Sequence, residues 1–446
     1  MKMYAEHRAA LMRRLPDGLI LLSGGREVPR NGDVAYVFRQ KSDFLYLSGV
    51  EEPGCHLLID PRRRRGVLFV PRVDTRHRVW LGHIPGPAEA RRLFGIRRVA
   101  HVDALPAAIK KDRRGYRKAY ADKEAWRQFE AGLRGLKNEP ATLRDALEEL
   151  RAVKAPEELK LMAEASRVSA RAHLRAMKAA RAGMRECQVQ AVFEAECLNA
   201  GLRHLAFPTI VAAGANSAVL HYRRNDTTLR DGQLLLVDGG AEVKGYAGDI
   251  TRTFPVGRRF TRRQRDIYSI VLETQTACIG KARAGITSAD LHILSMRAIA
   301  EGLKSIGLLK GGVDGLVEGG AVRLFYPHGL GHLLGLDVHD GKGGRRRRLP
   351  DPTKIPLRFV AKLEPGFVMT IEPGVYFIGA LLNDPALRRK HRGSVDFRRA
   401  EGFLDFGGVR IEDDIVILPK GPPKNLTRVP KRIEEIEAIR ERQAGG

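Results

Sequence analysis

Two aspartates stand close together in the segment LLLVDGGAEVKGYAGDITRTFPV, which covers residues 234–256. Asp238 ends an apolar stretch that predicts a buried strand, and Asp249 follows beyond a turn that contains Gly245 and Gly248. A carboxylate at the end of a buried strand is costly unless it is paired, hydrogen-bonded or bound to a metal. Two neighbouring carboxylates also repel each other unless a cation lies between them. The pair therefore indicates either a metal site or two aspartates that cap a turn.

Three histidines, His328, His332 and His339, lie in the Gly-rich apolar segment FYPHGLGHLLGLDVHD, residues 325–340. Imidazole nitrogens bind transition metals, and they also serve as general acids, general bases or donors to an oxyanion. A single histidine is more often a packed or surface residue, but three in such a segment favour a functional role. The residue types alone leave open which of the three would bind a metal.

Two glutamates follow apolar runs that should be buried: Glu372 in VMTIEPGVYF and Glu412 in VRIEDDIVIL. Either one alone would commonly be a salt-bridge partner. With the two aspartates and one histidine they supply a ligand set that suits a pair of divalent ions. Two such ions lie roughly 3.5–4 Å apart and can hold a hydroxide between them. The chain has no H-E-x-x-H zinc motif, no P-loop and no serine nucleophile elbow.

The elements around these residues predict an α/β (α+β) fold. In the N-terminal part, short apolar runs bounded by Gly, Pro and Asp predict strands, and longer segments predict helices. The predicted strands are Leu19–Leu22, Val34–Phe38, Cys55–Ile59 and Val67–Val70, and the predicted helices are Pro87–Phe94, Ala121–Leu136 and Ala141–Val153.

A change in the sequence pattern near Ala155 predicts a domain boundary. Pro156 followed by two glutamates is typical of a helix start, because proline suits the first turn and acids suit the positive end of the helix dipole. A long helix should run from there towards Met177, so we predict domains at 1–152 and 153–446. The later elements expected are strands at Leu234–Val237, Val368–Ile371 and Val409–Ile417, and a helix at Lys431–Gln443.

The composition is ordinary for a globular protein, with 43% hydrophobic and 29% charged residues among 446. No stretch approaches about 18 uninterrupted apolar residues, so no membrane span is expected. The first residues lack the compact apolar segment of a secretory signal, and the four cysteines form no C-x-x-C pair. Scattered reduced thiols and the missing signal together predict a cytoplasmic location.

The net charge of +26 could indicate binding to nucleic acid or to a membrane surface. The arginines, however, are spread along much of the chain. The dense runs Arg62–Arg65 and Arg345–Arg348 lie among Pro and Gly, so they should be exposed loops, and neither contains the aromatic residues of a base-stacking surface. A solvated basic surface is the favoured interpretation, and neither nucleic acid nor a membrane is the expected partner.

The order Asp, Asp, His, Glu, Glu in these segments resembles the pita-bread metallopeptidases, which include methionine aminopeptidase, prolidase and aminopeptidase P. Four segments resemble the proline-specific branch of this family: KGYAGDITRTFPV, HGLGHLLGLDVHD, TIEPGVYF and RIEDDIVI. FRQKSDFLYLSGVEEPG (38–54) and RVWLGHIPGP (78–87) are similar to the N-terminal domain of aminopeptidase P. The resemblance covers nearly the whole chain and implies a creatinase/aminopeptidase-P-like α/β domain followed by a pita-bread catalytic domain.

The resemblance also implies how the ligands are shared between the ions. Asp249 and Glu412 would bridge two metals, Asp238 would bind one of them, and His332 with Glu372 would bind the other. Glu372 would in addition carry a proton to the proline nitrogen. The family expectation for the metal is Mn²⁺, and Co²⁺, Zn²⁺ or Fe²⁺ could fill the same ligands.

Further residues match active-site positions of the family. The resemblance implies that His221 (in VLHY), His328 and His339 line the site, position substrate and stabilise the oxyanion. Arg410 matches an arginine beside the site that could orient a peptide, and Tyr376 would form a hydrogen bond nearby.

The implied activity is hydrolysis of the N-terminal Xaa–Pro bond of peptides by a hydroxide held between two metals. Two alternatives stay open: a prolidase restricted to Xaa–Pro dipeptides, and a non-catalytic binding module on the same fold that could bind nucleic acid. Trp80 matches a residue that approaches a neighbouring subunit's site in tetrameric relatives, which favours a homo-oligomer, either a dimer or a tetramer.

Two charged segments depart from the family pattern. Residues 341–362 form a longer and more basic link, and residues 377–408 form an insertion before Glu412. Both are expected near the mouth of the site, where they would influence the length of the substrate and the assembly. Arg358, in the first segment, is a candidate for an arginine of the pocket.

Overall fold

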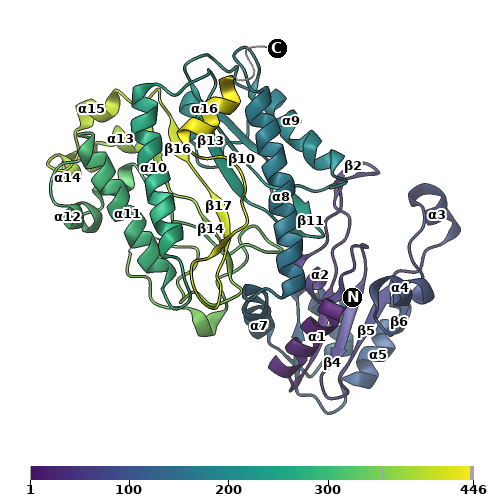
Figure 1. Ribbon diagram of the computed structural model, residues 1–446. Coiled ribbons are helices and arrows are strands. Elements are labelled where there is room, and N and C mark those ends of the chain that lie inside the picture. The colour runs from purple at the N-terminus through teal and green to yellow at the C-terminus, as the bar shows by residue number, and fades with distance from the viewer. Residues whose placement is uncertain (1, 354–355, 442–446) are drawn as a thin grey trace. The chain divides into compact units, whose positions relative to one another are not determined.

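The structure is a computed structural model that describes residues 2–353 and 356–441, and the chain divides into two compact units. The first unit comprises Met1–Arg151 with Gly344–Arg346, and the second comprises Ala152–Gly343 with Arg347–Gly446. Both units combine helices with β-sheets, as Figure 1 shows. Among the described residues, no helix has the length and apolar character needed to cross a membrane.

The first unit contains a six-stranded mixed sheet in the order β6-β5-β4-β1-β7-β8. The pairs β1–β4 and β4–β5 are antiparallel, and the pairs β5–β6, β1–β7 and β7–β8 are parallel. The strands β1 and β4 are buried along their whole length, and the centre of each is a run of Leu and Ile. The strands are β1 (Gly18–Ser23), β4 (His56–Asp60), β5 (Arg65–Val70), β6 (Arg98–His101), β7 (Lys118–Ala121) and β8 (Lys137–Asn138).

The helices of the first unit contribute to a core that includes Leu19, Leu21, Ile109, Ala125 and Leu133. The helices are α1 (Lys2–Arg14), α2 (Ser42–Ser48), α3 (Thr75–Leu81), α4 (Pro87–Phe94), α5 (Leu105–Asp112), α6 (Lys123–Leu133) and α7 (Pro140–Ala152).

One predicted strand of the first unit is wrong. The segment Val34–Phe38 contributes only β3 (Val34–Ala35), which pairs with β2 (Pro29–Asn31) in an exposed two-stranded ribbon. Val34, Tyr36 and Val37 are exposed rather than buried in a sheet. An apolar run therefore does not by itself guarantee a core strand, because the sheet must have an edge that can receive it.

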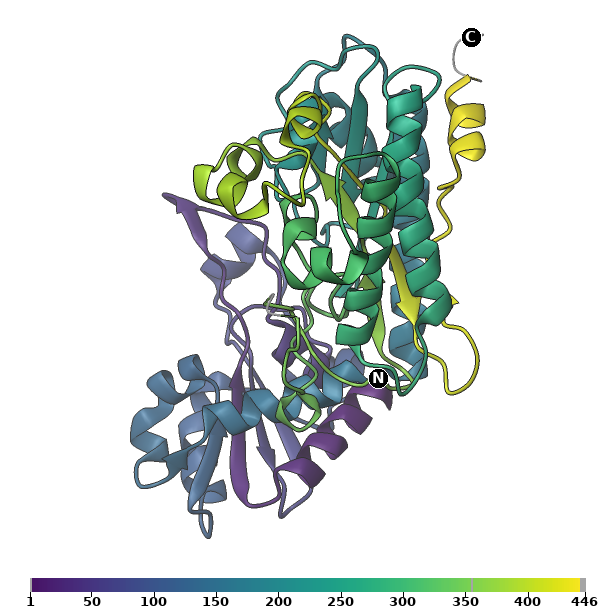
Figure 2. The same cartoon turned by 90° about the vertical axis from the view of Figure 1, so that its left-hand side faces the viewer.

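The second unit contains two halves with the same order of elements, each a pair of long helices followed by antiparallel strands. In the first half, α8 (Pro156–Ala179) packs against α9 (Glu186–Asn199). In the second half, α10 (Arg262–Lys281) packs against α11 (Ser288–Ser305). The strands lie between the two helix pairs in Figure 1, and Figure 2 shows α10 and α11 side by side.

The strands of the second unit form short antiparallel groups. The larger groups have the orders β13-β10-β9 and β14-β17-β18, and β15–β16 and β11–β12 are two-stranded pairs. The strands are β9 (Ile210–Ala213), β10 (Leu234–Gly239), β11 (Glu242–Val243), β12 (Tyr246–Ala247), β13 (Ile250–Pro255), β14 (Val368–Ile371), β15 (Gly374–Tyr376), β16 (Gly408–Arg410), β17 (Asp413–Val416) and β18 (Lys424–Asn425).

Shorter helices complete the second unit, and its main core unites residues of both halves, among them Val237, Phe254, Val271 and Val409. These helices are α12 (Val313–Glu318), α13 (Gly379–Leu382), α14 (Pro385–His391), α15 (Phe397–Glu401) and α16 (Ile433–Glu441), with 3₁₀ turns η2 (Gly214–Ala218) and η3 (Ala321–Leu324).

The predicted strand Val409–Ile417 is interrupted. The chain leaves β16, which pairs with β15, and enters β17, which pairs with β14, so Ile411 and Glu412 belong to neither strand. The predicted last helix is observed as α16, and Gln443 lies outside the described residues.

Candidate metal centre

The strands β10 and β13 bring the two aspartates of the site together. Asp238 in β10 faces Thr251 across the antiparallel pair, and Asp249 comes immediately before β13. The chain between them turns so tightly that a Cβ on Gly240 would lie 1.7 Å from the carbonyl oxygen of Gly248. Glycine is therefore required at position 240, and the local sequence explains how two distant carboxylates become neighbours.

His332 and Glu372 come from two adjoining segments. The backbone N–H of Thr370 in β14 donates to the carbonyl of His332 at 3.0 Å, and the N–H of His332 donates to Oγ1 of Thr370 at 3.1 Å. A Cβ on Gly331 would lie 2.0 Å from the carbonyl oxygen of Thr370, so this close approach also needs glycine. Glu372 follows the end of β14, where its N–H donates to the carbonyl of Leu330 at 2.8 Å.

Glu412 lies at the break between β16 and β17 and is held by β13. Its N–H donates to the carbonyl of Thr251 at 3.1 Å, and Oγ1 of Thr251 donates to Oε2 of Glu412 at 2.6 Å. The fully buried guanidinium of Arg252 donates to the carbonyl of Glu412 and to Oδ1 of Asp413, both at 2.7 Å. These bonds connect the second half of the unit to β13, the strand that immediately follows Asp249.

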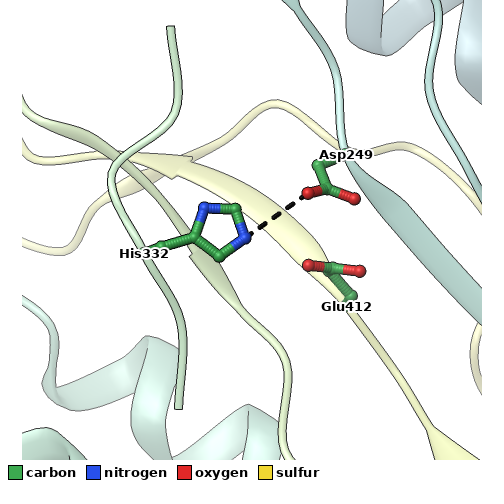
Figure 3. A group of neighbouring side chains, drawn as sticks. All are labelled: Asp249, His332 and Glu412. Carbon is green, nitrogen blue, oxygen red and sulfur yellow. Dashed lines mark ion pairs between the residues drawn. The ribbon is translucent and has the colours of Figure 1, made fainter. Parts of the chain in front are cut away.

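Three of the predicted ligands point toward one another in Figure 3: Asp249, His332 and Glu412. Each offers one ligand atom, and these atoms all lie within 4.8 Å of one another. Nε2 of His332 lies 3.5 Å from Oδ2 of Asp249 and 3.5 Å from Oε1 of Glu372. Asp238 is also buried, and its Oδ1 has no hydrogen-bond partner among the residues that the structure describes.

The electrostatics of this cluster fit divalent cations. Burial, and secondarily the neighbouring carboxylates, raise the pKa of Asp249 and of Glu412 well above the ordinary values. Burial raises the pKa of Glu372 to about 7 and lowers the pKa of His332, which favours the neutral imidazole that binds metals. Carboxylates crowded in this way are stabilised as anions when cations lie between them. Oxygen donors with one imidazole suit a pair of divalent ions.

Arg410 lies beside the carboxylates and lines the same cavity. Its Nη2 donates to Oδ2 of Asp238 at 2.6 Å, its Nη1 donates to the hydroxyl of Tyr376 at 3.0 Å, and its Nε donates to Oγ1 of Thr251 at 3.1 Å. The guanidinium therefore orients one candidate ligand directly and Glu412 through Thr251.

His328 is held by hydrogen bonds at both ring nitrogens. Nδ1 lies 2.8 Å from the carbonyl of Gly329, and Nε2 lies 2.9 Å from the hydroxyl of Tyr376. Because a carbonyl can only accept, Nδ1 carries the proton and Nε2 accepts from Tyr376. Burial lowers the pKa of His328 to about 3, so the ring is neutral at pH 7. Neither nitrogen of His328 is left to donate to a substrate in this arrangement.

The rings of His339 and His221 are held less tightly than that of His328, whose two nitrogens both form hydrogen bonds. The ring of His339 stands at 84° to that of His332 with a centroid separation of 4.4 Å. Desolvation lowers the pKa of His339 and of His221, and the neighbouring charge of Arg358 acts in the same direction. Within the described parts of the chain, neither ring has a hydrogen bond, so both have nitrogens available to a substrate.

All five predicted ligands line one cavity of about 420 Å³, together with His221, His328, His339 and Arg410. Tyr376 is fully buried behind it and is not part of the lining. The segment 341–362 contributes Arg358 to the lining. The segment 377–408 contributes no residue to the lining. The lining residues include Phe207, Pro208, Ile210, Leu220, His221, Arg223, Asp238, Asp249, His328, His332, Val338, His339, Arg358, Glu372, Arg410 and Glu412.

Three residues that position the ligands were absent from the sequence predictions: Thr251, Arg252 and Thr370. Thr251 in β13 is two residues after Asp249, which immediately precedes that strand, so the period-2 alternation of an extended chain is a signal that could have pointed to it. Thr370 and Arg252 act through contacts between segments that are distant in the sequence, and local periodicity carries no signal of those contacts.

The basic runs of the sequence are partly engaged in ion pairs. Arg63 pairs with Asp60 at 2.6 Å, Arg347 pairs with Glu364 at 2.8 Å, and the guanidinium of Arg62 lies 4.3 Å from the ring centroid of Tyr116. The runs therefore serve local structure as well as the solvated surface that we expected.

Two family models match the chain. Residues 160–419 match metallopeptidase family M24, and residues 4–120 match the N-terminal domain of aminopeptidase P. The chain is similar to the Xaa-Pro aminopeptidase of Escherichia coli strain K12, with 36% identity over 455 residues that cover 98% of this chain and 97% of that protein. It is also similar to the Xaa-Pro dipeptidase of Homo sapiens, with 35% identity over 459 residues that cover 98% of this chain and 92% of that protein.

A solved structure shows the same fold. The zinc-substituted aminopeptidase P of Escherichia coli in complex with product matches with a TM-score of 0.86 and 33% identity, covering 99% of this chain and 98% of that chain. This match confirms the expected fold, an aminopeptidase-P-like N-terminal domain followed by a pita-bread domain. The chain therefore belongs to metallopeptidase family M24, in which it is a metallo-aminopeptidase that uses divalent metal ions.

Proposed function

We propose that the enzyme hydrolyses the bond between an N-terminal residue and a following proline at a centre of two divalent ions. The observation that carries this proposal is the convergence of Asp249, His332 and Glu412 in one buried cluster on the wall of the cavity. Relatives named Xaa-Pro aminopeptidase and Xaa-Pro dipeptidase match nearly the whole chain, which supports proline as the second residue of the substrate.

In this proposal, Asp249 and Glu412 would be shared by the two ions, Asp238 would hold one of them, and His332 with Glu372 would hold the other. The unpartnered Oδ1 of Asp238 supports its role as a ligand. When bound, two divalent ions lower the pKa of water and so supply a nucleophile near neutral pH. Mn²⁺ is our first choice of metal because the donors are mostly carboxylate oxygens, and Co²⁺, Zn²⁺ or Fe²⁺ could take its place.

The residues of the chain would then handle the substrate and its protons. Glu372 lines the cavity and would carry a proton to the proline nitrogen as the bond breaks. His339 and His221 have unengaged ring nitrogens in the described structure, so they would donate to the carbonyl oxygen and to the bound peptide. His328 would act differently from our first expectation, by fixing the hydroxyl of Tyr376 beside Arg410.

Proline explains why a dedicated enzyme is needed. The Xaa–Pro bond is a tertiary amide without an N–H, and the proline ring fixes φ. Peptidases that recognise that N–H or need a flexible chain therefore leave the bond intact. In the proposed site, contacts are made to the residue before proline and to the scissile carbonyl, neither of which depends on the missing donor.

One observation favours the second candidate, a prolidase that prefers Xaa–Pro dipeptides. Two arginines, Arg223 and Arg358, line the same cavity, and neither forms an ion pair with any described residue. A dipeptide places a free carboxylate one residue beyond the scissile bond, where such cations would attract it. A longer peptide has an amide there instead.

The experiment compares four substrates with matched chemistry: Gly-Pro, Gly-Pro-Ala, Gly-Ala and Gly-Ala-Ala. The proposal predicts cleavage of the first bond only when proline is second, and equal rates for proline and alanine peptides would contradict it. The ratio of tripeptide to dipeptide rates separates the two candidates. If Arg358 binds the carboxylate, Arg358→Met should slow Gly-Pro cleavage much more than Gly-Pro-Ala cleavage.

We also propose an oligomer, two domains at 1–152 and 153–446, and a cytoplasmic location. The exposed apolar side chains of Val28, Val37, Val79 and Trp80 in the first unit support an oligomer, because large exposed apolar surface commonly marks an interface. The four unpaired cysteines support a reducing compartment. Light scattering of the wild type and of Trp80→Ala would test the assembly, with a constant mass in both contradicting a role for Trp80.

A further inference from the structure

The segment that carries His221 is held by its neighbouring residues and not by the imidazole. It runs from the 3₁₀ turn η2 to the start of β10, and within the described chain the ring of His221 has no hydrogen bond. The residues on both sides of Tyr222, namely His221 and Arg223, line the cavity, whereas Tyr222 is 7% exposed and does not. The position of His221 therefore depends on what holds Tyr222.

The ring of Tyr222 packs on the strands that carry the metal centre. It belongs to a small buried cluster with Ile210, Ala212 and Leu236, which come from β9 and β10. In the register of these strands, Ile210 lies opposite Asp238. Tyr222 thus places the His221 segment against the same strand that presents a candidate ligand.

The hydroxyl of Tyr222 contacts a wholly buried carboxylate, that of Glu186 in the first turn of α9. Tyr222 OH donates to Oε2 of Glu186 at 2.9 Å, and the N–H of Thr227 donates to the same oxygen at 2.9 Å. Oε1 of Glu186 accepts from the N–H of Ala213 at 2.7 Å and from Nδ2 of Asn216 at 2.9 Å. We call Glu186 and these four donors the Glu186 anchor.

The Glu186 anchor reaches across the segment that contains His221. Two of its donors, Ala213 and Asn216, precede His221, and Tyr222 and Thr227 follow it. Burial raises the pKa of the Tyr222 phenol, and the carboxylate beside it acts in the same direction, so the hydroxyl stays a donor. None of these five residues lines the cavity or belongs to the predicted ligand set.

We infer that Glu186 is a positioning residue of the reaction, which holds His221 against the substrate through the hydroxyl of Tyr222. This inference rests on the proposed function, because it assigns a substrate contact to His221. Hydrogen bonds to a buried charge are the strong ones, and four of them from one segment leave the backbone near His221 little freedom.

The chemistry of the donors makes the negative charge necessary. Each oxygen of Glu186 accepts two hydrogen bonds, and one donor to each oxygen, Ala213 or Thr227, is a backbone N–H that can only donate. In Glu186→Gln the amide NH₂ would face at least one of these N–H groups in either orientation. Tyr222→Phe is a milder change, because the ring keeps its packing and only the hydroxyl is lost.

The test is a double-mutant cycle in the full-length, metal-loaded enzyme. Tyr222→Phe should lower kcat/KM for Gly-Pro-Ala by about tenfold, the size expected for a lost hydrogen bond to a charged group, and Glu186→Gln should lower it further. In the His221→Ala background, Tyr222→Phe should change kcat/KM by less than about twofold, because the anchor acts through His221. Equal losses in both backgrounds would overturn the inference, because they would mean a general structural effect.

A matched control is Tyr116→Phe. Tyr116 is also buried, and its hydroxyl also donates to a carboxylate, Oδ1 of Asp60, at 2.8 Å in the first unit. It should leave kcat/KM unchanged, and the bound metal per chain should be the same in all variants. A loss in Tyr116→Phe as large as that in Tyr222→Phe would overturn the inference.

Hydrogen–deuterium exchange separates this inference from the proposed function. Tyr222→Phe and Glu186→Gln should speed amide exchange in residues 214–228, and Tyr116→Phe should not. If the wild type cleaves no Xaa–Pro peptide, the proposed function fails, while faster exchange in this segment would still support the anchor. Unchanged exchange in both variants would overturn the anchor, whatever the peptidase activity.

Discussion

Arg410 donates from Nη2 to Oδ2 of Asp238 at 2.6 Å, while the other oxygen of this carboxylate is buried without a partner among the described residues. One side of Asp238 is therefore oriented by a fixed cation, and the other side is left for a ligand. A carboxylate held in this way is pre-organised, so a metal ion that binds it does not have to order the side chain.

The first prediction concerns this pair. Arg410→Met should weaken metal binding or slow turnover by about 10- to 100-fold, because residues that orient a metal ligand have effects of this size. Calorimetric titration of Mn²⁺ into the metal-free enzyme would measure the first quantity, and kcat/KM would measure the second. Wild-type values for both would show that Asp238 needs no orientation by Arg410.

The second prediction concerns Thr251, whose Oγ1 accepts from Arg410 and donates to Glu412. Thr251→Val keeps the shape of the side chain and leaves both partners without this bond, so we expect kcat/KM to fall by about tenfold. Thr274→Val is the matched control, because Thr274 is equally buried but its hydroxyl bonds only within α10, to the carbonyl of Ile270. Equal activities of the two variants would count against a role for Thr251.

The sequence carries more signal for the residues of the candidate centre than for the contacts that hold them. The strand Val368–Ile371 is observed with the predicted bounds, because it is a short apolar run that ends at Pro373. The run Val409–Ile417 was predicted as one strand, yet it changes partners at Glu412. Apolar patterning reports burial but not the partner strand, so the interruption that frees Glu412 could not be foreseen.

The same limit applies to the residues around the ligands. The proposal that His332 is the ligand among the three histidines rests on the resemblance, since all three have the same local chemistry. The engagement of both nitrogens of His328, one by Gly329 and one by Tyr376, depends on contacts between segments that no spacing reveals. The anchoring of the His221 segment by Glu186 is of the same kind.

The third prediction uses His292, which lies in α11 with 1% of its surface exposed and no hydrogen bond to either ring nitrogen from the described residues. Burial lowers its pKa from 6.5 to about 4; Arg323 acts in the same direction, and Asp351 opposes them. Between these values the unfolded chain binds a proton that the folded chain does not. The free energy of unfolding should therefore fall as the pH drops from 6.5 to about 4, by at most about 1.4 kcal/mol per pH unit from this group.

Urea unfolding of the wild type and of His292→Leu at several pH values would measure this contribution. The variant should lose less stability over this pH range, because leucine has no proton to bind. Above pH 6.5 the free energy of unfolding should change with pH at nearly the same rate in the two proteins. Parallel curves for the two proteins below pH 6.5 would mean that His292 does not titrate as proposed.

The fourth prediction concerns a buried ion pair next to His339. Nζ of Lys154 donates to Oδ2 of Asp340 at 2.8 Å, and both side chains are 1% exposed. Lys154→Met should lower the free energy of unfolding by about 3–5 kcal/mol, because it removes the buried ammonium that faces this buried carboxylate. Adding Asp340→Asn should recover part of this loss. Stability equal to the wild type in the single variant would show that the pair contributes nothing.

We propose that Asp238, Asp249, His332, Glu372 and Glu412 would hold two divalent ions in an enzyme that hydrolyses Xaa–Pro bonds. The most direct test measures bound metal per chain together with Gly-Pro-Ala hydrolysis, after chelation and after Mn²⁺ is added back, in the wild type and in Asp249→Ala. The account predicts no turnover in the stripped enzyme, recovery as two ions bind, and loss of most turnover in a folded Asp249→Ala. Full turnover in the stripped enzyme or in Asp249→Ala would contradict it.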